Sequence, residues 1–214
     1  MIIHDVEQNS DEWYNVRLGI VTASSMNRII TSTGKRSTQR KKYMYQLLDE
    51  RVYNEYNPTF NGSKTNVRVK NKYTDRGHEL EEEAAGYFSL LNDVELHKIG
   101  FCTTDDGLIG ASLDRFINDK EIVEIKNPAI ETHHEYLDSK DTFYTKYKVQ
   151  VQTQMFVYGA DVCHLYSYFP RRPELIIPVE RDDKFISLMK KMVDEFNDEL
   201  ATKVEEFKEE YNVK

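Results

Sequence analysis

The chain has 214 residues, a formal net charge of −8 at pH 7, 39% hydrophobic residues and 31% charged residues. This length supports one sizeable core without disulfide staples, so we expect a single domain over residues 1–214. No apolar run approaches the roughly 20 residues that cross a bilayer, and we expect no membrane partner. Cys102 and Cys163 are two isolated cysteines without CxxC spacing, so neither a zinc cluster nor a disulfide framework is indicated. Together with an N-terminus that lacks a signal-peptide pattern, they indicate a cytoplasmic protein.

The charge is unevenly distributed along the chain. An acidic total argues against a broad nucleic-acid-coating surface, but it permits a basic channel for a polyanion. Acidic residues gather in the C-terminal segment, and basic residues gather in the first third. The basic residues of that third include Lys35, Arg36, Arg40, Lys41, Lys42, Lys64, Arg68, Lys70 and Lys72.

The N-terminal third predicts three helices and a loop. A short helix starts after Asn9 or Ser10 as N-cap and ends before Gly19. A second helix is expected from Thr22 to Ile30, where the hydroxyl residues either cap the helix or leave N–H groups free for an anion such as phosphate. Residues 38–53 form a third helix, and the polar stretch 54–72 reads as a long loop.

A helix carrying three consecutive glutamates is predicted next, from Tyr73 to Leu91. Its apolar stripe consists of Leu80, Ala84, Tyr87, Phe88 and Leu91. At roughly 100° per residue, Glu81 and Glu83 flank this stripe, while Glu82 points away from it. Helix geometry therefore excludes Glu82 from a site but does not choose between the other two.

The second half of the chain predicts strands separated by helices. Strands are expected at 94–103, 162–169 and 175–179, with a helix at 141–159 and a closing helix from residue 183. Gln150 and Gln154 lie one turn apart and share a face of the 141–159 helix. This order predicts one α/β fold with a mixed central sheet flanked by helices.

The most informative stretch is a predicted β-hairpin from Leu108 to Lys126, turning at Asn118-Asp119. Side chains repeat every two residues along a strand, so Glu124 and Lys126 share one face, and Asp114 on the first arm can lie opposite them. Two carboxylates and an ammonium at the edge of a core are costly unless a cation or substrate is expected there. The alternative is a solvated surface ion pair, which contributes little.

Four blocks of the chain resemble the lambda exonuclease and YqaJ-like viral recombinase family of the PD-(D/E)xK nuclease superfamily. Residues 11–24 resemble its W-x-x-x-R-x-G-x-x-T-A-S block, and residues 77–84 resemble its G-x-x-x-E helix. Asp114 with 124–126 resembles the D-x(9)-E-x-K core, and residues 147–152 resemble the Y-x-x-Q-x-Q helix. The blocks occur in the family's order, and the resemblance implies a restriction-endonuclease-like α/β core.

The resemblance also implies catalytic roles. Asp114 and Glu124 would be metal ligands, and Glu81, four residues after Gly77, would be a further acidic ligand. Lys126 would orient or deprotonate the attacking water, and Gln150 would help to hold that water or the substrate. Oxygen ligands of this kind suit Mg²⁺, and paired ions can activate water and stabilise the attacking and leaving oxygens.

A second set of residues is similar to the family's pocket for a 5′-terminal phosphate: Arg17, Ser24 and Ser112. This chain departs from the family at Leu113, where proline often precedes the aspartate. The metal core does not depend on that position. His78 has a counterpart in RecB-type nucleases, and its participation stays open, as does that of Glu83.

The implied activity is Mg²⁺-dependent 5′→3′ exonuclease digestion of one strand of linear double-stranded DNA, leaving 3′ overhangs for single-strand annealing. We expect two Mg²⁺ ions, for which Mn²⁺ can substitute, with the Ile125 backbone carbonyl among the ligands. The resemblance also implies a homotrimer, a single-strand annealing partner, and a phage or prophage origin in a bacterial host. The alternatives are a structure-specific or restriction-type endonuclease and a non-catalytic DNA-binding subunit on the same fold.

Overall fold

The computed structural model describes residues 1–54 and 72–213, with side chains described from residue 80 onward in the second segment. Residues 55–71 of the loop predicted at 54–72, and the side chain of His78, therefore lie outside the described residues. The helices are α1 (Asp11–Asn15), the 3₁₀ helix η1 (Ala23–Arg28), α2 (Arg40–Tyr53), α3 (Lys72–Asn92), α4 (Ile130–Asp138), α5 (Lys140–Tyr158) and α6 (Asp183–Tyr211). The strands are β1 (Ile2–His4), β2 (Val21–Thr22), β3 (His97–Thr103), β4 (Ile109–Phe116), β5 (Glu121–Lys126), β6 (Val162–Ser167) and β7 (Leu175–Glu180).

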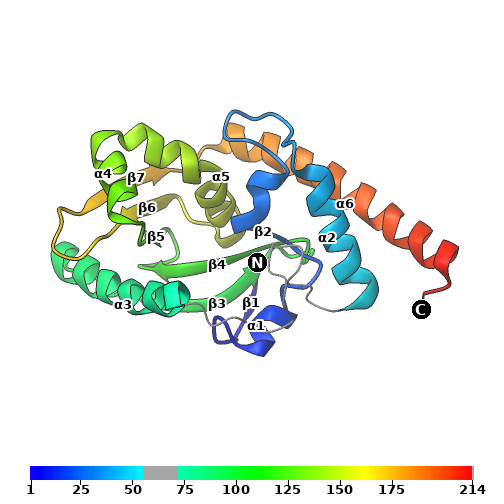
Figure 1. Cartoon of the computed structure of the whole chain (residues 1–214), viewed down its shortest axis with the longest axis horizontal. Helices are drawn as coiled ribbons and strands as arrows, with labels where there is room; N and C mark the ends of the chain where they lie inside the picture. The colour runs from blue at the N-terminus through cyan, green and yellow to red at the C-terminus, as the bar shows by residue number, and fades with distance from the viewer. Residues whose placement is uncertain (55–71, 214) are drawn as a thin grey trace.

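The strands form one mixed sheet in the order β1-β3-β4-β5-β6-β7, with β2 paired in parallel to β4 (Figure 1). The predicted hairpin forms β4 and β5, which pair antiparallel, and the Asn118 carboxamide oxygen accepts from the Lys120 N–H at 2.8 Å in the turn. The pairing of β5 with β6 is parallel, because α4 and α5 carry the chain back across the sheet. The mixed α/β fold predicted from the sequence is confirmed.

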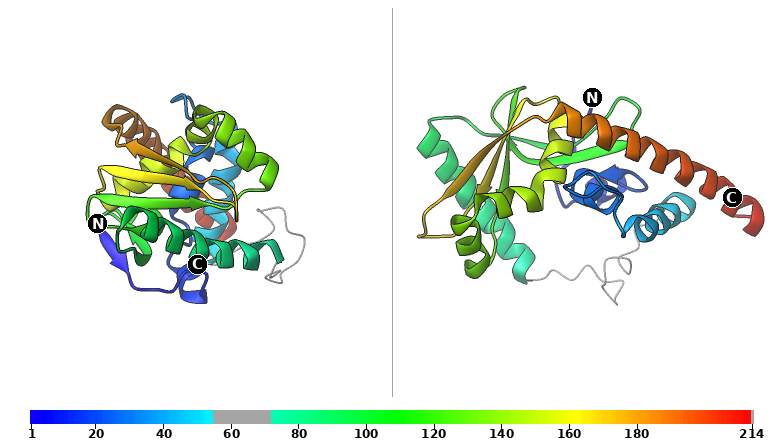
Figure 2. Two further views of the ribbon diagram at one scale, coloured as in Figure 1. Left: turned by 90° about the vertical axis from the view of Figure 1, so that its left-hand side faces the viewer. Right: turned by 90° about the horizontal axis from the view of Figure 1, so that it is seen from above.

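Helices cover both faces of the sheet, which is why β5 is buried on both sides over its four central residues. On one face α3 packs Ala84 and Phe88 against Val123 and Ile125 of β5. On the other face α5 packs against β4, and α6 covers α5 in turn. The C-terminal turns of α6 extend past the rest of the chain (Figure 2).

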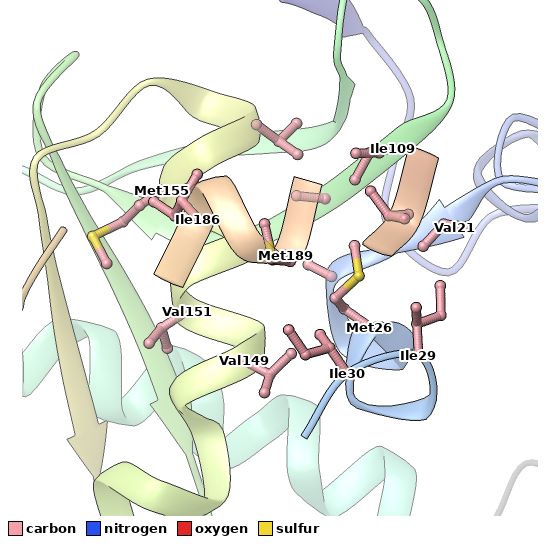
Figure 3. Packing of buried hydrophobic residues seen from close by; sticks show 14 of the residues in the cluster. Val21, Met26, Ile29, Ile30, Ile109, Val149, Val151, Met155, Ile186 and Met189 are labelled. Carbon is pink, nitrogen blue, oxygen red and sulfur yellow. The ribbon is translucent and has the colours of Figure 1, made fainter. Parts of the chain in front are cut away.

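The larger core joins segments far apart in the sequence. Side chains from η1, β4, α5 and α6 interlock around Met26, Ile109, Met155 and Met189, all of which are almost completely buried (Figure 3). This packing holds the N-terminal segment that carries Arg17 and Ser24 against the helix that carries the glutamines.

Two predictions about helices were wrong. The segment from Thr22 to Ile30 is not an α-helix but a short strand followed by a six-residue 3₁₀ helix, because Val21 and Thr22 pair with β4 instead. On α3, Tyr87 and Leu91 are exposed rather than buried. The contact face of α3 is formed by Ala84, Ala85 and Phe88, since two small side chains let the helix lie close to β5.

Residues 130–140, for which no structure was predicted, contain α4.

Candidate active site and phosphate pocket

Three of the predicted charged residues meet on the face of the sheet that α5 covers. Glu124 is 2% exposed, and its Oε1 accepts from the Lys126 ammonium two residues along the same strand. Asp114 lies on the neighbouring strand β4, and its Oδ2 accepts from the Ile125 N–H at 2.7 Å. The spacing Asp-x(9)-Glu-x-Lys thus brings three charges together because two strands joined by a short turn present them on one face.

Two glutamines of α5 complete the shell around Glu124. Gln150 Nε2 donates to Glu124 Oε1, and Gln154 Nε2 donates to Glu124 Oε2 at 2.6 Å. Gln154 also donates to the Ser112 carbonyl at 3.1 Å, so it connects the buried carboxylate with the backbone of β4. Gln152, the second glutamine of the Y-x-x-Q-x-Q block, faces elsewhere and bonds to Glu180 and Asp182.

Gln154 was not among the predicted site residues. The signal for it is its position one turn after Gln150 on the same face of the helix.

The electrostatics of this group are those of crowded, buried charges. Burial and the neighbouring carboxylate of Glu124 raise the pKa of Asp114 well above its ordinary value, against the opposing effect of Lys126. Burial by itself would lower the pKa of Lys126, but the carboxylates of Glu124 and Asp114 outweigh it and raise that pKa above its ordinary value. Lys126 is therefore a cation at neutral pH, which favours an orienting role over that of a general base in the absence of a bound metal ion.

The three consecutive glutamates of α3 have two different partners: the first two share Arg115, and the third contacts Tyr168. Glu81 Oε1 lies 2.9 Å from Nη1 of Arg115, and Glu82 Oε1 lies 2.8 Å from Nη2 of the same guanidinium. Glu83 accepts from the Tyr168 hydroxyl at 2.6 Å. Arg115 pairs with Val123 in the sheet and so faces α3, whereas Asp114 faces α5. Glu81 is close enough to raise the pKa of Asp114, but it lies against Arg115 rather than between Asp114 and Glu124.

Arg115, which directly follows Asp114, was not among the predicted site residues. It is 4% exposed, and its guanidinium also donates to the Asp114 carbonyl. A buried arginine is retained where carboxylates can pair with it, and the two glutamates of α3 satisfy that condition.

The donor set suits a hard divalent cation. Asp114 and Glu124 supply carboxylate oxygens, and a residue's N–H and C=O point toward the same neighbouring strand, so the Ile125 carbonyl lies on the side of Asp114. The mutual repulsion that raises the pKa of Asp114 is the charge imbalance that a cation would relieve. Within residues 1–54 and 80–213, no three His, Cys, Asp or Glu side chains are already arranged around one metal position. The residues fit Mg²⁺ with two carboxylates in place, and Glu81 would have to leave Arg115 to become a third.

Of the three residues predicted to bind a 5′-phosphate, Arg17 contacts Ser112, and Arg17 and Ser24 line the same cavity. Arg17 Nη1 donates to Ser112 Oγ at 2.8 Å, and Trp13 Nε1 donates to the same oxygen at 3.0 Å. The Arg17 guanidinium stacks 3.8 Å above the Trp13 ring. Ser24 Oγ lies 3.4 Å from Thr22 Oγ1. Arg17, Trp13, Thr22 and Ser24 line a cavity of about 280 Å³.

The hydroxyl residues at the start of the Thr22 to Ile30 segment were expected either to cap a helix or to leave N–H groups free for an anion. The structure shows no capping by Thr22. The Thr22 side chain makes no capping hydrogen bond, and the Thr22 backbone N–H donates to the Tyr43 hydroxyl at 3.3 Å. The 3₁₀ helix is only six residues long, so an anion here would depend on Arg17 and on the hydroxyl groups more than on a helix dipole.

Beneath the same cavity lies a carboxylate that sequence reasoning did not single out. Glu50 is 5% exposed; its Oε2 accepts from the Gly19 N–H at 3.0 Å and its Oε1 accepts from Gln46 Nε2 at 2.8 Å. Gln46 in turn accepts from Arg28 Nη1 at 2.7 Å. Burial raises the pKa of Glu50. This network fixes the backbone at Gly19, two residues after Arg17.

None of the helices in the described part of the chain is long and apolar enough to cross a membrane.

Comparison with known proteins identifies the family. Residues 12–161, more than half of the chain, match the YqaJ-like viral recombinase domain. The structure is similar to that of LHK-Exo, an alkaline exonuclease from Laribacter hongkongensis, with a TM-score of 0.78 at 27% identity, covering 95% of this chain and 98% of that one. LHK-Exo in complex with dAMP gives a TM-score of 0.81 over the same shares of both chains.

A phage-related exonuclease from Haemophilus somnus 129PT shares the fold, with a TM-score of 0.68 at 18% identity, covering 88% of this chain and 96% of that one. The comparison with curated proteins found no match. The chain belongs to the YqaJ-like viral recombinase family and is a nuclease of the lambda-exonuclease type.

Proposed function

We propose that this nuclease is a Mg²⁺-dependent 5′→3′ exonuclease that degrades one strand of linear double-stranded DNA and leaves a 3′ overhang for phage-type recombination. The observation that carries the proposal is the convergence of Asp114, Glu124 and Lys126 beside Gln150 and Gln154. The similar LHK-Exo was solved with dAMP, a deoxynucleoside monophosphate, which is the class of product that this proposal assigns.

Each residue has a distinct task in the proposed reaction. Asp114, Glu124, the Ile125 carbonyl and Glu81 would hold two Mg²⁺ ions, for which Mn²⁺ can substitute. When bound, Mg²⁺ supplies Lewis-acid stabilisation of the phosphate charge and lowers the pKa of water. Lys126, cationic beside Glu124, would orient the attacking water.

Gln150 has a positioning task in this scheme. Its amide donates to Glu124, which holds the carboxylate in one orientation, and in the proposed reaction it also helps to hold the attacking water or the substrate. The arrangement depends on hydrogen bonds already present in the protein, so little reorganisation is needed when substrate binds.

The preference for a 5′-phosphorylated end would come from Arg17, Ser24 and Ser112. Arg17 lines the cavity and is oriented by Ser112 and Trp13, and a guanidinium is well suited to bidentate phosphate binding. Ser112 also connects this cavity to the carboxylates, because its carbonyl accepts from Gln154. A phosphate held at Arg17 would therefore set the distance from the 5′ end to the cleaved bond.

The decisive experiment is digestion of end-labelled linear duplex and of covalently closed circular duplex, each with Mg²⁺ and with EDTA. An exonuclease needs an end, so only the linear DNA should be degraded, and only with Mg²⁺. Cleavage of the circular DNA would identify an endonuclease, and no cleavage of either would identify a DNA-binding subunit. Equal rates on 5′-phosphate and 5′-hydroxyl ends would count against the pocket while leaving the nuclease assignment intact.

The role of Lys126 has its own test. Lys126→Ala should abolish cleavage and leave DNA binding nearly unchanged, because the ammonium acts on the attacking water and not on the bulk of the duplex. Cleavage at the wild-type rate would remove Lys126 from the mechanism.

We further propose that the chain forms a homotrimer around DNA and works with a single-strand annealing protein, both carried over from the family resemblance. Sedimentation at working concentration tests the first, and a monomer would contradict it. Co-purification with a single-strand annealing protein tests the second.

A further inference from the structure

The turn between β6 and β7, residues 168–174, projects beyond the end of the sheet at which Lys126 lies (Figure 1). In the parallel register, Lys126 pairs with Ser167, and the Tyr168 N–H donates to the Lys126 carbonyl at 2.9 Å. The turn therefore begins directly beside the last residue of the candidate active site. At about 3.3 Å per extended residue, position 171 lies within roughly 10 Å of Tyr168 along the chain.

This turn is held in shape by a buried histidine that the proposed mechanism does not use. His133 of α4 is fully buried; its Nδ1 lies 2.9 Å from Ser167 Oγ and its Nε2 lies 3.0 Å from the Pro173 carbonyl. The ring of Phe169 packs at 6.3 Å from that of His133, and the Arg172 N–H closes the turn on the Phe169 carbonyl at 3.1 Å. Both ends of the turn are thus anchored, so its tip is preorganised.

The tip carries two exposed arginines, and one of them has an unusual backbone. Arg171 has φ of +61°, the left-handed region that glycine and asparagine adopt most easily. A long side chain at such a position carries a backbone cost, and residues of this kind gather at functional sites. Arg172 follows it directly, and both arginines are exposed. Glu174 is the only acidic residue of the turn.

We propose that Arg171 and Arg172 form a second DNA contact, a rigid basic tip that binds phosphates of the duplex close to the cleavage site. The inference rests on the proposed DNA substrate. A reach of at most roughly 10 Å corresponds to no more than about three nucleotides at about 3.4 Å per step of one strand. The net charge of −8 provides no general attraction for DNA, so local cations must hold it at the active edge.

The test is the salt dependence of DNA binding, measured by fluorescence anisotropy on a 5′-phosphorylated linear duplex in EDTA, which prevents hydrolysis. Each phosphate contact adds about 0.9 to the slope of log K against log salt. Arg171→Gly should reduce the slope by about 0.9 and weaken binding about eightfold at 0.1 M monovalent salt. Arg172→Ala should do the same.

Glycine makes Arg171→Gly an informative variant, because it removes the cation and relaxes the backbone at φ of +61°. Its Tm should equal or exceed that of the wild type, so a loss of binding cannot be attributed to unfolding. Arg171→Lys keeps the charge and should retain the wild-type slope. Lys191→Ala removes an exposed cation from α6, which begins at the far end of β7 from the turn, and should also leave the slope unchanged.

The salt slopes of these variants distinguish failure of the basic tip from failure of the proposed function. If wild type binds and cleaves DNA but Arg171→Gly and Arg172→Ala keep the wild-type slope, the basic tip is refuted and the proposed function stands. If Lys191→Ala lowers the slope as much as they do, the effect is one of total charge and the tip is refuted as well. If the wild type binds no duplex, the proposed function falls and this inference falls with it.

Discussion

The buried ion pair at the centre of the site allows a quantitative prediction about stability. Lys126→Met keeps most of the side-chain volume but removes the ammonium from Glu124, a residue that is 2% exposed. Among the residues that the structure describes, Glu124 then lies beside Asp114 with only the amides of Gln150 and Gln154 as donors. Removing one partner of a buried pair costs about 3–5 kcal/mol, and the two remaining amides place this case near the lower value.

A loss of about 3 kcal/mol corresponds to a fall in Tm of roughly 6–12 °C for a chain of this size. Urea denaturation measures the free energy directly, and thermal unfolding measures Tm. The double variant Glu124→Gln/Lys126→Met should be more stable than Lys126→Met alone, because no unpaired carboxylate is left in the core.

The matched control is Lys98→Met, which removes a lysine that pairs with Glu82 at the surface, where the two side chains are 63% and 59% exposed. That change should alter stability by less than about 1 kcal/mol. If Lys126→Met is as stable as the wild type, or if adding Glu124→Gln destabilises it further, the reasoning that Lys126 neutralises a buried charge is refuted.

Three further predictions follow from the same structure. Saturating Mg²⁺ should raise the Tm of the wild type and not that of Asp114→Asn, because only the carboxylate pair binds the ion; equal shifts would exclude this site as the one occupied. Burial raises the pKa of Glu50, so its folded state holds a proton more tightly than its unfolded state. The stability that this carboxyl contributes should therefore decline as pH rises from its unfolded value near 4.5 through the raised folded value. Glu50→Gln should have a flatter profile of Tm against pH, and a parallel profile would contradict the assignment. Burial raises the pKa of Cys102 to about 12, so the native thiol should resist iodoacetamide at pH 8 and react after unfolding, as mass spectrometry can show.

The core of the candidate site could be predicted from the sequence because it is local. Asp114, Glu124 and Lys126 lie within one hairpin, and the two-residue repeat of a strand places the last two on one face regardless of the rest of the fold. The shared face of Gln150 and Gln154, from which both reach Glu124, follows in the same way from the turn of a helix. Short-range geometry of this kind depends on backbone dihedrals, which the local sequence determines.

The glutamates of α3 show where local reasoning ends. Helical spacing left Glu81 and Glu83 equivalent and excluded Glu82, yet Glu81 and Glu82 share Arg115 while Glu83 reaches Tyr168. The rotation of α3 about its axis is determined by Ala84 and Ala85 packing on β5, a contact that no spacing rule contains.

The phosphate pocket depends even more on tertiary structure. Arg17 meets Ser112 across 95 residues of chain, and Glu50 supports Gly19 across 31. What the sequence alone determined was the set of chemical groups and the hairpin that presents three of them. Only the packing of helices on both faces of the sheet decided which distant groups became neighbours, because that packing is a property of the whole core.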